Sequence, residues 1–68
     1  MMSFYSWIIL RHWDEDTPMG DLARDVYADK SFPKRGKYKD ILTHLKECNA
    51  CDGAIECFKK AWAEYVKE

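Results

Sequence analysis

The stretch Ala54-Ile-Glu-Cys-Phe-Lys-Lys-Ala-Trp-Ala-Glu-Tyr-Val66 decides how this chain folds. Its large apolar residues recur at spacings of three and four, which puts them on one side of a 3.6-residue helix. They are Ile55, Phe58, Trp62 and Tyr65. A stripe with three aromatic rings is too apolar to remain exposed to water. In a chain of 68 residues, only the upstream part is available to cover it. The stretch therefore predicts a helical bundle built around a C-terminal helix.

Length and composition predict a single small domain, residues 1–68. A chain of 68 residues has no room for a second domain. The net charge of −1 provides no global attraction to nucleic acid or membrane, and the longest apolar run, Trp7–Leu10, cannot span a bilayer. No basic residue precedes that run as in a secretory signal, and three cysteines suit a disulfide scaffold poorly. We therefore expect a cytoplasmic, reduced protein with no membrane partner.

The first segment of the chain, Phe4–His12, is apolar on nearly every side. Ser3 precedes it and is a good N-cap residue. Its Phe, Tyr, Trp and Ile residues also favour strands. A lone strand would have no partner, however, because nothing downstream alternates between apolar and polar residues. The segment is therefore predicted to be a central helix.

A second helix is predicted to start at Pro18 and run to about Ala28. Thr17 is suited to cap it, Pro18 fits the first helical position, and the preceding acidic residues favour the positive end of its dipole. Gly20 costs this helix about 1 kcal/mol against Ala, which suggests a close contact with another helix. The residues expected on its inner face are Met19, Leu22, Ala23, Val26 and Tyr27.

An irregular connection, residues 29–36, separates this helix from a third one at about Lys37–Glu47. Pro33 holds Phe32 extended, and we expect the Phe32 ring to turn inward. Four side chains of the third helix are expected to point into the core: Tyr38, Ile41, Leu42 and Leu45. The next break precedes Asp52, which we expect to cap the final helix.

A set of residues spread along the whole chain resembles the YozE-like proteins. The matching motifs are Ser3-Phe4-Tyr5-x-Trp7-Ile8 with Arg11, Pro18-x-x-x-Leu22-Ala23, Asp29-x-x-Phe32-Pro33, Tyr38-x-x-Ile41-x-x-x-Leu45, Asn49-Ala50 and Phe58-x-x-x-Trp62-x-x-Tyr65. The resemblance implies a small bacterial or phage-associated domain with a compact, all-α, SAM-like bundle of four to five short helices. It brings no established active site. The chain departs from the family pattern at His44, where a Tyr is more usual, and in its pair Cys48 and Cys51.

Four potential zinc ligands lie within fourteen residues: His44, Cys48, Cys51 and Cys57. A structural zinc site needs such ligands arranged as a tetrahedron. Cys57, however, falls on the flank of a continuous helix, and His44 takes the place of a half-buried aromatic ring. Free cysteines often behave as small buried hydrophobes. Structural cysteines are therefore the favoured interpretation, ahead of zinc and of a redox Cys-x-x-Cys, and we expect no metal and no cofactor.

Catalytic patterns are weak in this sequence. The acidic run Asp14–Asp16 precedes a helix, where its charge complements the dipole, and His12 beside it is best explained as a surface ion pair. There is no glycine-rich phosphate loop, and no spacing supports a Ser-His-Asp or Cys-His arrangement. We expect no enzyme activity.

One segment has a clear basic bias. Five cations fall within ten residues that contain no acid, and Phe32 and Tyr38 lie among them. They are Lys30, Lys34, Arg35, Lys37 and Lys39. A basic loop before a helix start could hold backbone phosphates, so these residues are candidates for binding a partner or phosphate. The plainer interpretation, which we favour, is a solvated loop that keeps the domain soluble.

Two function classes follow. The favoured one is a non-catalytic protein-interaction module, with a partner protein of unknown identity. The alternative is weak association with nucleic acid through the basic segment 30–39. The near-neutral charge argues for the first, because DNA-binding domains usually carry a clearly basic pI.

Overall fold

A computed structural model describes residues 2–68 of the chain as a bundle of four helices without strands. The helices are α1 (Phe4–His12), α2 (Pro18–Ala28), α3 (Tyr38–Glu47) and α4 (Asp52–Lys67). The predicted all-α class is therefore confirmed, and the first two helices begin and end where the sequence places them. Within residues 2–68, none of these helices has both the length and the apolar character that crossing a membrane requires.

The helix starts follow local capping chemistry. The Ser3 and Thr17 side chains accept hydrogen bonds from the backbone N–H groups of Ser6 and Gly20, at 3.2 and 3.1 Å, as the sequence predicts. The final helix differs in one detail, because Cys51 is its N-cap and Asp52 is its first helical residue. The Asp52 carboxylate still lies in the first turn, where it complements the helix dipole.

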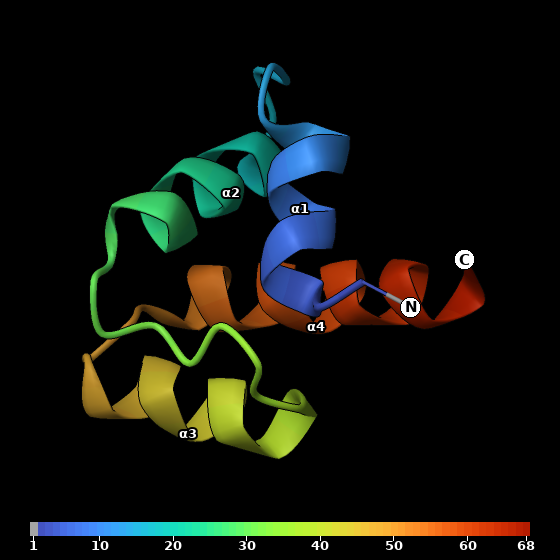
Figure 1. The fold of residues 1–68 in the computed structure, drawn as a ribbon. Helices are drawn as coiled ribbons and strands as arrows, with labels where there is room; N and C mark the ends of the chain where they lie inside the picture. The colour runs from blue at the N-terminus through green and yellow to red at the C-terminus, as the bar shows by residue number, and fades with distance from the viewer. Residues whose placement is uncertain (1) are drawn as a thin grey trace.

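The long helix α4 lies between α3 on one side and the pair α1 and α2 on the other (Figure 1). Helix α1 packs against both α2 and α4, while α3 packs against α4. The connection between α2 and α3 crosses the bundle, and its Phe32 ring is buried with 5% exposure, as expected. The start and the end of the described chain also meet, since Trp7 Nε1 donates to a Glu68 carboxylate oxygen at 3.0 Å.

The core is formed by apolar side chains from all four helices and the connection. Its buried members are Phe4, Trp7, Ile8, Leu22, Ala23, Val26, Phe32, Ile41, Phe58 and Ala61. Phe4 and Phe58 meet edge to face at its centre, with ring centroids 5.4 Å apart. The α4 stripe is only partly as predicted, because Phe58 is fully buried whereas Trp62 and Tyr65 lie at the edge of the core.

One further expectation needs correction. Tyr27 was expected to face inward, yet it is 61% exposed and packs edge to face on Trp13 at 5.1 Å. Gly20 permits the expected close approach to another helix, because a Cβ atom there would lie 3.1 Å from the His12 carbonyl oxygen at the end of α1, and it also approaches the backbone of the α1–α2 connection. A Cβ atom added at Gly20 would lie 1.9 Å from the Glu15 carbonyl oxygen.

Candidate functional site

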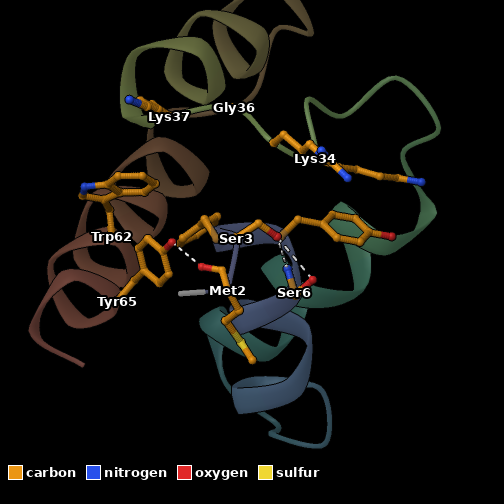
Figure 2. A pocket seen from close by; sticks show the side chains of 11 residues that line it. Met2, Ser3, Ser6, Lys34, Gly36, Lys37, Trp62 and Tyr65 are labelled. Atoms are coloured by element: carbon orange, nitrogen blue, oxygen red, sulfur yellow. Dashed lines mark hydrogen bonds between the residues drawn. The ribbon is translucent and has the colours of Figure 1, made fainter.

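An open groove of about 640 Å³ forms where the start of α1, the connection before α3 and the end of α4 come together (Figure 2). Its lining is contributed by residues 2–6, residues 34–37, Trp62 and Tyr65. Three segments that are far apart in the sequence therefore build one surface. The groove includes part of the predicted basic segment.

The structure divides the five predicted cations between different surfaces. Lys34, Arg35 and Lys37 line the groove, whereas Lys30 is exposed on the turn after α2 and is not part of the lining. Lys39 lines a separate hollow beside His44. Three of the five cations therefore lie together in the groove, and the other two lie outside its lining.

The N-terminus of α1 adds to the positive character of the groove. Ser3 caps the helix, and its hydroxyl donates to the Ser6 Oγ at 3.2 Å. The first turn of α1 contains no acidic residue, whereas the first turns of α2, α3 and α4 each contain an aspartate. The positive end of the α1 dipole is thus not offset by a carboxylate of its own first turn.

Aromatic side chains form the apolar part of the groove. The Trp62 and Tyr65 rings lie 5.1 Å apart and are partly exposed, and the Tyr65 hydroxyl donates to the Met2 carbonyl oxygen. On the other side, the Lys34 ammonium lies 5.3 Å from the centre of the Tyr5 ring. The helical spacing of Trp62 and Tyr65 predicts that they belong to the core, so this aromatic wall of the groove could not be expected from the sequence.

The predicted zinc ligands do not assemble as a set. Among residues 2–68, the metal-capable side chains that converge are Asp29, His44 and Cys48, and neither Cys51 nor Cys57 joins them. Cys48 and Cys51 are exposed, so the expectation of buried structural cysteines is wrong for both. Only Cys57 is half-buried, and this burial raises the pKa of its thiol.

His44 is the half-buried ring that the sequence predicts. Its edge packs against the face of Phe32 at 5.8 Å, and its Nε2 atom lies 2.7 Å from a carboxylate oxygen of Asp29. The hydrogen bond with His44 lowers the pKa of the Asp29 carboxyl. This contact joins the ends of α2 and α3 across fifteen residues of sequence, so sequence spacing gave no sign of it.

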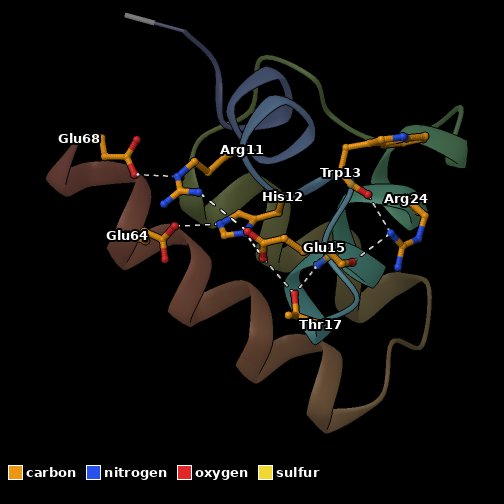
Figure 3. A network of polar contacts seen from close by, with 9 residues as sticks. Arg11, His12, Trp13, Glu15, Thr17, Arg24, Glu64 and Glu68 are labelled. Atoms are coloured by element: carbon orange, nitrogen blue, oxygen red, sulfur yellow. Dashed lines mark hydrogen bonds and ion pairs between the residues drawn. The ribbon is translucent and has the colours of Figure 1, made fainter.

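A second polar cluster surrounds His12 (Figure 3). The sequence suggested a surface ion pair, but the His12 side chain is only 6% exposed. Its Nδ1 and Nε2 atoms lie 2.7 and 2.8 Å from carboxylate oxygens of Glu15 and Glu64. Both ring nitrogens are thus engaged, and the cluster ties the end of α1 to α4. The hydrogen bond from His12 also lowers the pKa of Glu15.

Fold and site together define a small all-α domain with a basic and aromatic groove. The chain belongs to the YozE SAM-like fold family, whose match covers residues 3–67. It is 39% identical over 51 residues to a UPF0346 protein of Bacillus cytotoxicus, covering 74% of this chain and 70% of that protein. It is 32% identical over 50 residues to a UPF0346 protein of Bacillus mycoides, with the same coverage. No solved structure matches the chain at a comparable level of significance. The SAM-like bundle predicted from the sequence motifs is confirmed.

Proposed function

We propose that this protein is a non-catalytic interaction module whose groove binds an acidic segment of a partner protein. The observation that carries the proposal is the combination of groups in one hollow. Three cations, the positive end of α1 and an aromatic wall all line the groove. An extended peptide that alternates carboxylates with apolar side chains matches this lining in charge and in character.

The cations alone would give little affinity. Lys34, Arg35 and Lys37 are exposed, and a solvent-exposed ion pair contributes about 0–1 kcal/mol. The Trp62 and Tyr65 rings supply the apolar contact, and aromatic residues often dominate the binding energy of interfaces. We expect dissociation constants on the order of 1–100 μM, because about 6–8 kcal/mol of net binding energy corresponds to this range. The binding should weaken as salt screens the ion pairs.

Nucleic acid is the less favoured ligand because the basic segment is divided. With Lys30 and Lys39 on other surfaces, the groove could neutralise at most three phosphates. The salt dependence on duplex DNA would then have a log–log slope of roughly −3. The net charge of −1 would further oppose binding to a polyanion.

The test is a fluorescence anisotropy titration with short labelled peptides in which Asp or Glu alternates with Leu or Trp. Peptides with Lys at the acidic positions serve as the charge control, and single-stranded and duplex DNA are titrated in parallel. The double variant Lys34→Glu, Arg35→Glu should weaken acidic-peptide binding at least about tenfold. The matched variant Lys46→Glu, Lys59→Glu makes the same change in net charge outside the groove lining and should bind nearly as well as wild type.

Three results would contradict the proposal. One is that acidic peptides do not bind even at low salt. Another is that the two double variants lose binding equally, which would indicate a nonspecific charge effect. The third is that DNA binds more tightly than the acidic peptides and depends on Lys34 and Arg35, which would favour the alternative.

A further inference from the structure

The carboxyl ends of α2 and α3 bring three side chains of metal-binding chemistry to one point. Asp29 is the C-cap residue of α2, and Cys48 is the C-cap residue of α3. His44 lies one helical turn before Cys48, so both side chains project from the same side of α3. The potential ligand atoms of Asp29, His44 and Cys48 all lie within 4.8 Å of one another.

We propose that Asp29, His44 and Cys48 form a binding site for a zinc-class divalent transition-metal ion. This site differs from the one that the sequence spacing suggested, because it uses Asp29 and omits Cys51 and Cys57. Imidazole and thiolate ligands favour Zn²⁺ or Co²⁺ over Mg²⁺ and Ca²⁺, which prefer all-oxygen sites. Three protein ligands leave the fourth tetrahedral position for water or for a donor from another molecule.

The distances suit a tetrahedral ion with little rearrangement. Ligand atoms at about 2.1 and 2.3 Å from a tetrahedral zinc stand about 3.6 Å from each other. The Cys48 Sγ and His44 Nε2 atoms are 3.6 Å apart. The Asp29 oxygen is 2.7 Å from the same nitrogen and would need to withdraw by roughly 0.6 Å. On binding, the Cys48 thiol releases its proton to solvent, and the bond to the metal replaces the Asp29–His44 hydrogen bond.

Neighbouring groups already hold the three ligands in place. The second Asp29 oxygen accepts the Ser31 backbone N–H at 2.9 Å, which leaves the first oxygen directed at His44. The buried Phe32 ring packs against the imidazole and limits its rotation. Such supporting contacts commonly orient the ligands of metal sites. The negative ends of the α2 and α3 dipoles also favour a cation between them.

The ion would have an open route to the site. A surface hollow of about 530 Å³ beside His44 is lined in part by Asp40 and Glu47, and Cys48 is itself exposed. Lys39 also lines this hollow. Its positive charge would moderate the attraction of the two carboxylates for cations.

The test uses the full chain, reduced and freed of metal with a chelator, and titrates it with Co²⁺ followed by Zn²⁺. We expect one Co²⁺ per chain, visible bands of a tetrahedral complex and a sulfur-to-cobalt absorption that Zn²⁺ removes. Cys48→Ser should abolish the sulfur band, and Asp29→Asn should weaken binding roughly 10–100-fold. The matched control Cys51→Ser, also at an exposed cysteine, should retain both the band and the affinity.

A second measurement needs no variant. Thiol alkylation of the wild-type chain, mapped by mass spectrometry, should show that Zn²⁺ protects Cys48 while Cys51 reacts at an unchanged rate.

For the variants of the cobalt titration, circular dichroism confirms that the helices remain. Absence of a sulfur band with Co²⁺, or equal loss of binding in Cys48→Ser and Cys51→Ser, would overturn the proposal. Equal protection of Cys48 and Cys51 would overturn it as well, because it would indicate a Cys-x-x-Cys site.

Discussion

Among the three glycines, Gly20 is the position at which adding one methyl group should be most costly. The added Cβ would lie 1.9 Å from the Glu15 carbonyl oxygen and 3.1 Å from that of His12, so backbone would have to move. Gly20→Ala should therefore destabilise the protein by about 1–3 kcal/mol, even though Ala is the better helix former. Urea unfolding followed by circular dichroism measures this change.

Gly53 provides the matched control for this substitution. It also lies in the first turn of a helix, but a Cβ there meets nothing within 4 Å. Gly53→Ala should leave stability unchanged or raise it by up to about 1 kcal/mol. If both variants changed stability in the same direction, the close packing at Gly20 would not be the cause.

Glu15 should make the stability of the protein depend on acid pH. Its pKa in the folded protein is lowered from the ordinary value of 4.5, chiefly by the hydrogen bond with His12. A carboxyl with a lowered folded pKa stabilises the protein above its unfolded pKa, and this contribution is lost as the pH falls through the folded value. The stability difference between wild type and Glu15→Gln should therefore be fully present above pH 4.5 and shrink as the pH falls below this value.

Thermal melts at several pH values between about pH 3 and pH 6 test this dependence. The control is Glu56→Gln, because Glu56 is exposed on α4 and pairs only loosely with Lys59 at 3.8 Å. A constant difference between wild type and Glu15→Gln across this range would contradict the expected linkage.

At the scale of the secondary-structure elements, α4 has two aromatic residues with different roles. Phe58 is fully buried and packs on Phe4, whereas Trp62 lies at the edge of the core and lines the groove. Phe58→Ala should cost about 3–5 kcal/mol, the usual range for a large core aromatic. Trp62→Ala should cost clearly less, since part of its ring already contacts solvent and burial energy scales with the area removed from water.

Chemical unfolding of the two variants gives this order directly. The Trp62→Ala protein should remain folded and lose affinity for the acidic peptides, which separates the binding role of Trp62 from its structural role. A larger loss of stability in Trp62→Ala than in Phe58→Ala would contradict this order and show that Trp62 is the more important core residue.

At the scale of the whole molecule, the arrangement of α4 explains both proposed sites. Helix α4 separates α3 from the α1–α2 pair, so the α2–α3 connection has to cross the bundle (Figure 1). At one end of this connection, Asp29 comes to lie beside His44. At its other end, Lys34 and Lys37 come to face the start of α1 and the end of α4. The same crossing segment therefore supplies residues to the groove and to the proposed metal site.

The candidate groove could be predicted only in part. The basic segment is visible as a cluster of lysines, because its members are neighbours in the sequence. The sequence does not show that three of these cations line the groove and two lie outside it. Lys39, for example, lies on α3 and lines a different hollow. The aromatic wall was hidden because apolar periodicity does not tell how much of a stripe its neighbours will cover.

The sequence by itself determined the helices, the capping residues of α1 and α2 and the identity of most core positions. These features depend on contacts within four residues along the chain, such as the Thr17 cap and the spacing of Phe58 in α4. Only the tertiary structure decided that His12 is buried against Glu64, that Trp62 borders a groove and that Asp29 joins His44 and Cys48. The physical reason is that these contacts join residues far apart in the sequence, such as His12 and Glu64, which are 52 positions apart. Their formation depends on how the helices pack in space.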